Sequence, residues 1–211
     1  MSPENSSALV PFLLTVAGFL LGSIPFSVLI GKLGTGVDIR QYGDHNPGST
    51  NVLRARGWKL ALVALLLDAF KGAIPVSLGW FWLGISGVAI VPVALAPVAG
   101  HAFSPWLGWR GGKAVATTFG IWTGLTLGAG PITLGLLLGV MFAVFENSAW
   151  AMILAFLAFG GFILPYYAAT YPEFGLVWLG NLAILLIKHR GELRQPAGIR
   201  PGLLKRISRQ P

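Results

Sequence analysis

Cysteine is absent from this 211-residue chain, and charged residues are scarce. Without cysteine the chain can form no disulfide, no thiol nucleophile and no thiolate metal site. Only 10% of its residues are charged and 55% are hydrophobic, whereas a soluble domain carries about a quarter charged residues. So few charges cannot cover a water-facing surface, which indicates a membrane protein.

The sequence also lacks the patterns of several common catalytic sites. Its only histidines, His45, His101 and His189, are scattered, and no pair of acids stands at metal-ligand spacing with them. None is followed five positions later by aspartate, which excludes the His-x4-Asp motif of soluble acyltransferases, and GxSxG is missing. We therefore expect no metal, no cofactor and little equipment for proton transfer.

Long apolar stretches recur along the chain. A membrane-spanning helix needs about 20 apolar residues, and the apolar stretches lie near 8–31, 60–80, 83–100, 114–129, 131–145, 149–169 and 174–188. We predict an all-α, polytopic integral membrane protein with about seven transmembrane helices; five or six is the alternative count. The first stretch lacks a preceding basic region and is too long for a signal peptide, so we expect it to be retained.

Basic residues predict the orientation in the membrane. Lys71 lies inside the second span, and every other Lys and Arg lies at the end of an odd-numbered span or follows one. The positive-inside rule then places the N-terminus outside and the C-terminus in the cytoplasm. We predict one transmembrane domain, residues 1–190, and a basic cytoplasmic tail, residues 191–211, against the anionic inner leaflet. We expect no nucleic-acid partner.

A polar loop reads GDHNPGSTN over residues 43–51. Its glycines permit close backbone approach, and successive N–H groups can hold an anion. A helix that begins near Ser49 would point its N-terminal dipole at such an anion and place Asn51 and Arg54 on one face. A plain surface loop with a helix cap explains the same residues.

Four further polar segments lie on the same predicted side. The residues Gly111, Gly112 and Lys113 come directly before an apolar helix. Gly-Gly-Lys at the start of a helix resembles a phosphate-binding loop, although the full GxxxxGK[ST] spacing is absent. His101 is either a general base or a polar residue at a helix end.

Asp68 and Lys71 share a helix face inside the second span, either to line a site or as a structural ion pair. His189 leaves the last span between two basic residues that fit a stop-transfer cluster, and its charge can change near neutral pH. Ser148 ends the short connection 145–148 before the sixth span, where it either completes a ligand site or caps a helix.

Together these segments resemble the bacterial acyl-phosphate:glycerol-3-phosphate acyltransferases, the PlsY family. The resemblance is carried by NPGSTNVLR (46–54), LLLDAFKG (65–72) and GHAFSPWLGWRGGKAVAT (100–117), and it extends from GSIPFSVLIGKL to KHRGEL. It implies an enzyme of the bacterial inner membrane whose active site faces the cytoplasm. The implied reaction transfers a fatty acyl group from acyl phosphate to the 1-hydroxyl of sn-glycerol 3-phosphate, and yields lysophosphatidate and phosphate for phospholipid synthesis.

The resemblance and the polar clusters give the candidate site. We expect three catalytic residues: Arg54, Lys113 and His189. We expect the following residues to bind substrate: Asn46, Gly48, Ser49, Thr50, Asn51, Asp68, Lys71, His101, Gly111, Gly112 and Ser148. Acyl phosphate is already activated, so orientation and charge neutralisation suffice for the transfer. The expected partners are the two phosphorylated substrates and membrane lipid, and the oligomeric state is left open.

The chain departs from the usual family motifs in three loops. Asp44, His45 and Ser49 replace Ser, Gly and Ala of Gly-Ser-Gly-Asn-x-Gly-Ala-Thr-Asn. Ala114 replaces the Gly after Gly-Gly-Lys, and Glu192 replaces the Asn of His-Arg-x-Asn. Asp44 and Glu192 add negative charge where phosphate is expected. These two acids leave an inactive paralogue open as an alternative. A second alternative is a transporter of a phosphorylated or anionic solute, which would share the broken helices and the basic polar pocket.

Overall fold

Helices form most of the chain in the computed structural model, which describes residues 3–201. The longer helices are α1 (Pro3–Ser23), α2 (Phe26–Thr35), α3 (Ser49–Arg56), α4 (Trp58–Ser77), α5 (Ile90–Ala102), α6 (Val115–Thr126), α7 (Ala129–Val144), α8 (Ser148–Tyr167) and α9 (Glu173–Leu193). Short helical turns are η1 (Ile39–Gln41), η2 (Leu78–Trp82), η3 (Gly87–Ala89) and η4 (Pro105–Leu107). Residues 3–201 contain no strand, which confirms the predicted all-α class.

The predicted apolar stretches all fall on helices. Within residues 3–201, four segments are long and apolar enough to cross a membrane: Ala8–Gly34, Trp58–Trp82, Gly87–Leu107 and Ser148–Tyr167. α7 is a shorter apolar helix. α6 forms most of the predicted span 114–129, and α9 contains all of the predicted span 174–188. Large apolar side chains such as Phe12 and Leu136 lie exposed on the outer surface, as expected where lipid replaces water. The count of seven spans stays a prediction.

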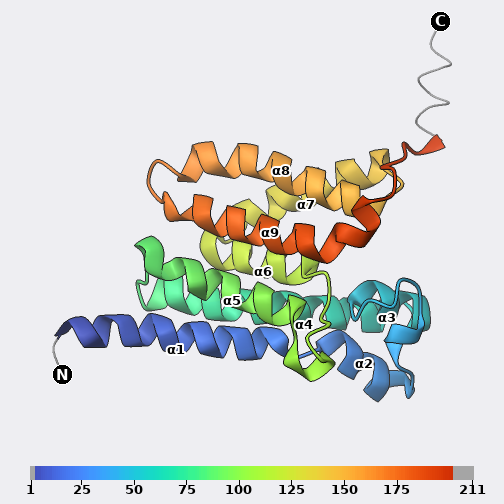
Figure 1. Ribbon diagram of the computed structural model, residues 1–211, viewed down its shortest axis with the longest axis horizontal. Helices are drawn as coiled ribbons and strands as arrows, with labels where there is room; N and C mark the ends of the chain where they lie inside the picture. Colours follow the sequence, from blue (N-terminus) through green and yellow to red (C-terminus); the bar gives the residue numbers. More distant parts are fainter. Residues whose placement is uncertain (1–2, 202–211) are drawn as a thin grey trace, which may run out of the picture.

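The helices lie side by side in a bundle (Figure 1). α1 packs on α5, α4 packs on α6, and α7 packs on α8, while α9 lies against both α5 and α8. α2, α3 and the C-terminal end of α9 lie toward the same end of the bundle, far from the connection between η2 and α5 (Figure 1). The polar segments that the sequence separates are therefore gathered at one end.

Small residues bring α4 and α6 into close contact. A Cβ added at Gly120 would overlap the Ala69 carbonyl oxygen, and one at Gly72 would lie 2.7 Å from that of Thr117. Such small residues let membrane helices approach backbone to backbone. The resulting contact holds Asp68 and the start of α6 near each other, and the Thr117 hydroxyl donates a hydrogen bond to the Asp68 carbonyl (3.0 Å).

The last helix extends beyond the predicted apolar stretch 174–188. α9 continues to Leu193. The chain then turns back: Glu146 and Asn147 donate backbone hydrogen bonds to the carbonyls of Gly198 and Ala197 (3.0 and 3.1 Å). The first part of the predicted tail therefore packs on the α7–α8 connection, and residues 202–211 lie outside the described residues.

Candidate active site

A cavity of about 390 Å³ lies at the end of the bundle where the polar segments meet. Many of the predicted site residues line it: Asn46, Gly48, Ser49, Thr50, Arg54, Asp68, His101, Lys113, Ser148 and His189. Asn51, Lys71, Gly111 and Gly112 are not among its lining residues. The structure thus brings together side chains from segments up to about 140 residues apart, which local sequence patterns alone do not place in contact.

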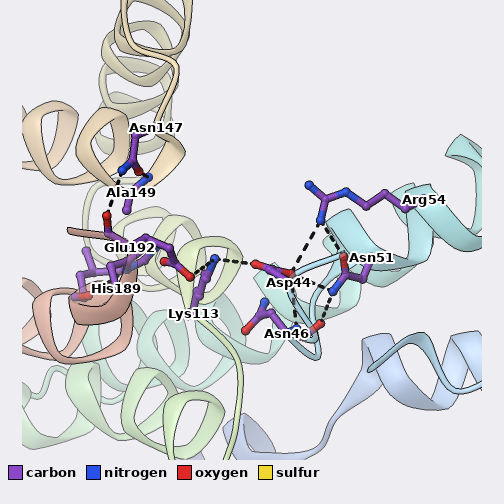
Figure 2. A network of polar contacts seen from close by, with 10 residues as sticks. Asp44, Asn46, Asn51, Arg54, Lys113, Asn147, Ala149, His189 and Glu192 are labelled. Atoms are coloured by element: carbon purple, nitrogen blue, oxygen red, sulfur yellow. Dashed lines mark hydrogen bonds and ion pairs between the residues drawn. The ribbon is translucent and has the colours of Figure 1, made fainter. Parts of the chain in front are cut away.

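The loop over residues 43–51 is held by side-chain hydrogen bonds to α3. Asn51 is 1% exposed, and its Nδ2 donates to Asp44 Oδ1 and to the Asn46 carbonyl, each at 2.9 Å. Arg54 donates in turn to Asn51 Oδ1 (2.9 Å), as Figure 2 shows. Gly43 has φ +59° and a Cβ there would overlap Arg54 and Asn51, so only glycine fits. Asn51 therefore positions the loop rather than lining the cavity.

The N-terminus of α3 faces the cavity. α3 begins at Ser49 with Gly48 as its N-cap, which confirms the predicted start of this helix. The first backbone N–H groups of a helix have no partner within it. Since Gly48, Ser49 and Thr50 line the cavity, these N–H groups and the helix dipole favour an anion there.

Lys113 is the cation at the centre of the site. Its Nζ lies 2.6 Å from Asp44 Oδ2 and 3.0 Å from Glu192 Oε1, and Arg54 lies 3.7 Å from Asp44 Oδ1. Burial raises the pKa of Asp44, but the hydrogen bond and charge of Lys113 and the bonds from Asn51 and Asn46 outweigh it, so the net pKa is lowered. Both acidic departures from the family motifs therefore contact the predicted phosphate-binding lysine.

The Gly-Gly segment packs against His101. A Cβ at Gly111 would overlap the His101 carbonyl oxygen and one at Gly112 would overlap the imidazole, while Gly112 N–H donates to that carbonyl (3.0 Å). Lys188 Nζ fixes the same segment by donating to the carbonyls of Gly111 and Ala102, each at 2.8 Å. The two glycines thus permit a close approach that positions Lys113, and their predicted contact with substrate stays a prediction.

The backbone conformation at Ala114 explains why the family motif has glycine after Gly-Gly-Lys. It has φ +61° and ψ +14°, the left-handed region that favours glycine, and it is the N-cap residue of α6. Alanine adopts this conformation at a cost of about 1–2 kcal/mol. The departure therefore keeps the turn and adds strain to it.

Asp68 and Lys71 form a buried ion pair, each residue 2% exposed. Lys71 Nζ lies 2.7 Å from Asp68 Oδ1 and donates to the Ile24 carbonyl (2.8 Å), while Ser27 Oγ donates to Asp68 Oδ2 (2.7 Å). His101 Nδ1 lies 3.7 Å from Asp68 Oδ1. This geometry supports the structural alternative for Lys71, whereas Asp68 and His101 also line the cavity.

α8 and α9 supply the opposite wall. His189 is 3% exposed, and its Nδ1 lies 2.8 Å from the Leu185 carbonyl. A carbonyl only accepts, so Nδ1 carries the hydrogen and Nε2 is the acceptor when the ring is neutral. Asn147 caps α8 by accepting from Ala149 N–H (3.0 Å) and donates to the Glu192 carbonyl (2.9 Å). This cap places Ser148 in the cavity wall.

The sequence analysis did not identify the apolar wall. Leu65, Val115, Leu138, Phe142 and Met152 line the cavity beside the polar residues. Each lies in an apolar run where nothing distinguishes it from its lipid-facing neighbours. A charged pocket with a hydrocarbon wall suits a ligand that carries both an anion and an apolar chain, which defines a membrane protein acting on amphiphilic phosphorylated molecules.

Comparison with known proteins identifies the family. Residues 12–197 match the glycerol-3-phosphate acyltransferase family. The glycerol-3-phosphate acyltransferase 1 of Thermotoga maritima is 38% identical over 197 residues, 87% of this chain and 96% of that protein. The glycerol-3-phosphate acyltransferase of Paramagnetospirillum magneticum is 42% identical over 180 residues, 85% of this chain and 86% of that protein. The chain therefore belongs to the glycerol-3-phosphate acyltransferase family.

Solved structures agree with this family. Two crystal structures of PlsY, an integral membrane glycerol 3-phosphate acyltransferase, are 30% identical to this chain and cover 88% of it and 90% of PlsY. TM-scores are 0.78 for the glycerol 3-phosphate form and 0.77 for the lysophosphatidic acid form. The comparisons confirm the predicted family, the membrane-protein class and the assignment as an enzyme, and they do not favour the transporter.

Proposed function

We propose that this protein transfers a fatty acyl group from acyl phosphate to the 1-hydroxyl of sn-glycerol 3-phosphate, in the bacterial cell membrane. The observation that carries the proposal is the single cavity in which Arg54, Lys113 and the N-terminus of α3 meet an apolar wall. The basic groups suit the two substrate phosphates, and the apolar wall suits the acyl chain.

The reaction needs little beyond positioning. The acceptor hydroxyl oxygen attacks the acyl carbonyl carbon, the bond from that carbon to the phosphate oxygen breaks, and phosphate leaves with the bonding electrons. The proton of the hydroxyl passes to the leaving phosphate or to the acceptor's own phosphate, so lysophosphatidate and inorganic phosphate result. Lys113 and Arg54 neutralise phosphate charge. Ser148 and His189, on the opposite wall, orient the acceptor.

The acyl chain enters the cavity from the bilayer. Leu65 and Phe142 line the cavity, yet their exposed fractions are 42% and 39%. We infer that the apolar wall continues onto the outer apolar surface of the bundle. A fatty chain can lie across Leu65 and Phe142 while its head group reaches Lys113.

The cavity faces the cytoplasm in our proposal. Basic residues are concentrated in the connections at the end of the bundle that holds the cavity, among them Arg54, Arg110, Lys113 and Arg190. The positive-inside rule assigns that end to the cytoplasm. Both substrates are then taken from the cytoplasmic side.

An acylation assay tests the proposed function. Purified protein in lipid is given acyl phosphate and labelled glycerol 3-phosphate, and labelled lysophosphatidate is expected. Uptake of label into sealed vesicles without acylation would instead support a transporter. Neither acylation nor uptake would support the inactive paralogue, in which Asp44 and Glu192 have neutralised the site.

A further inference from the structure

Two carboxylates from distant segments meet the same lysine beside the cavity. Asp44, in the loop before α3, lies 2.6 Å from Lys113 Nζ, and Glu192, near the end of α9, lies 3.0 Å from it. Figure 2 shows Asp44 between Lys113 on one side and Arg54 with Asn51 on the other. Asp44 therefore holds the place between two cations that an anionic ligand would take.

The charges of this group cancel. Lys113 and Arg54 carry two positive charges, and Asp44 and Glu192 carry two negative charges. A phosphate monoester carries roughly −1.5 to −2 charges at pH 7. These four side chains together exert no net attraction on the phosphate, which has to displace a carboxylate before it reaches Lys113.

The contacts of the two acids are suited to such displacement. The side chains of Asp44 and Glu192 are 37% and 36% exposed, so each can be rehydrated when it leaves Lys113. Asp44 uses Oδ1 for the bonds from Asn51 and Asn46 and Oδ2 for Lys113. The loop therefore keeps its own hydrogen bonds when the lysine moves. Glu192 Oε2 is buried and accepts no hydrogen bond from the described part of the chain, so Glu192 is held through Oε1 alone.

We propose that Asp44 and Glu192 determine specificity by competing with the substrate phosphate for Lys113 and Arg54. This inference rests on the proposed function and adds a selection step to it. A monoanionic ligand that displaces one carboxylate carries the same charge as that carboxylate, so it gains no electrostatic advantage over it. A phosphate dianion brings more charge to the two cations and displaces the acids. The site then selects phosphate monoesters over phosphodiesters and carboxylates.

A purely structural role for the same contacts predicts the opposite result. If Asp44 and Glu192 only bridged the loop, α6 and α9 through Lys113, then removal of either charge would loosen the cavity and weaken phosphate binding. The sign of the change in affinity therefore separates competition from structural support.

Asp44→Asn and Glu192→Gln are the test variants. Asparagine keeps the Oδ1 acceptor for Asn51 and Asn46, and glutamine keeps a helical side chain of the same shape, so each variant removes mainly the charge. Asp38→Asn is the matched control, because Asp38 lies in the same connection between α2 and α3 but pairs with Arg40 (2.6 Å) and does not line the cavity.

Calorimetric titration without acyl donor measures the dissociation constants of glycerol 3-phosphate, inorganic phosphate and acetate. We expect each single variant to bind the two phosphates about two- to fivefold more tightly, as the loss of one exposed competing ion pair predicts. The double variant is expected to bind them about tenfold more tightly and to discriminate less against acetate. Asp38→Asn is expected to match the unchanged protein.

Unchanged or weaker phosphate binding in folded Asp44→Asn and Glu192→Gln overturns the inference. Thermal unfolding identifies a variant that fails to fold, and the other single variant then decides the question. If the unchanged protein acylates glycerol 3-phosphate while the variants show no gain in affinity, this inference alone fails. If the unchanged protein neither binds nor acylates glycerol 3-phosphate, the proposed function fails with it.

Discussion

At the residue scale, Lys113 is the side chain on which the polar contacts of the cavity converge. Lys113 lies in the segment before α6 and its side chain is 19% exposed. It contacts Asp44 of the loop before α3 and Glu192 near the end of α9. Its partners are the carboxylates of Asp44 and Glu192, and an amide, Asn51, donates in turn to Asp44. The site is therefore built to hold and neutralise negative charge.

Lys113→Ala and Arg54→Ala are each expected to lower kcat/KM about 10- to 100-fold, because a charged hydrogen bond to substrate contributes about 1.5–3 kcal/mol. The acylation assay in lipid measures the change. Lys59→Ala is the control, since Lys59 is exposed at the start of α4 and does not line the cavity. Turnover that is unchanged in the Lys113 or Arg54 variant would contradict the assigned role.

Ala114→Gly is expected to stabilise the protein by about 1 kcal/mol, because glycine removes the strain of φ +61° at this position. Thermal unfolding in detergent measures the effect. Ala158→Gly, inside α8, makes the same chemical change in ordinary helix and is expected to destabilise by about 0.5–1 kcal/mol. Equal effects of the two substitutions would show that Ala114 is not strained.

At the scale of elements, the first predicted span consists of two helices, and a buried polar contact from another helix stabilises the break between them. α1 ends at Ser23 and α2 begins at Phe26, because Pro25 cannot donate a helical hydrogen bond. Lys71 in α4 donates to the Ile24 carbonyl at this break and pairs with Asp68. The break is tolerated because another helix satisfies the freed backbone group.

Lys71→Met is expected to destabilise the fold by about 3–5 kcal/mol, because it leaves Asp68 charged, buried and unpaired. The free energy of unfolding, or the folded yield, measures this loss. The double variant Asp68→Asn with Lys71→Met removes both charges, so its loss is expected to be smaller. Lys59→Met in the same helix changes an exposed lysine and is expected to stay within about 0.5 kcal/mol. A Lys71 variant as stable as the Lys59 variant would refute the structural role.

At the scale of the whole molecule, the polar connections gather at one end of an apolar bundle. The connection between η2 and α5 lies at the opposite end from the C-terminal end of α9 (Figure 1). The cavity shares the end that carries the basic connections, so the orientation of the bundle in the membrane decides which compartment supplies the substrates.

Because the chain has no cysteine, a single introduced cysteine reports the orientation of the protein in the membrane without background labelling of other thiols in the chain. Ser86→Cys, in the η2–α5 connection, is expected to react with a membrane-impermeant maleimide added outside intact cells. Gln195→Cys, after α9, is expected to react only once the membrane is opened. The reverse labelling pattern would overturn the proposed cytoplasmic cavity.

The sequence by itself determined the all-α membrane class, the family and the start of α3. These features depend on local quantities: apolar runs, glycine and proline positions, and motifs whose residues are close in the chain. The matching segments identified the family because their order and spacing can be read from the sequence without coordinates.

Only the tertiary structure decided which polar residues share a cavity and which hold it in place. Asn51, Gly111 and Gly112 belong to the same motifs as Arg54 and Lys113, yet they position the loops rather than line the cavity. The pairing of Asp44 and Glu192 with Lys113 joins residues up to 148 positions apart. The packing of whole helices sets such contacts, and no pattern within one segment encodes the distance between two others.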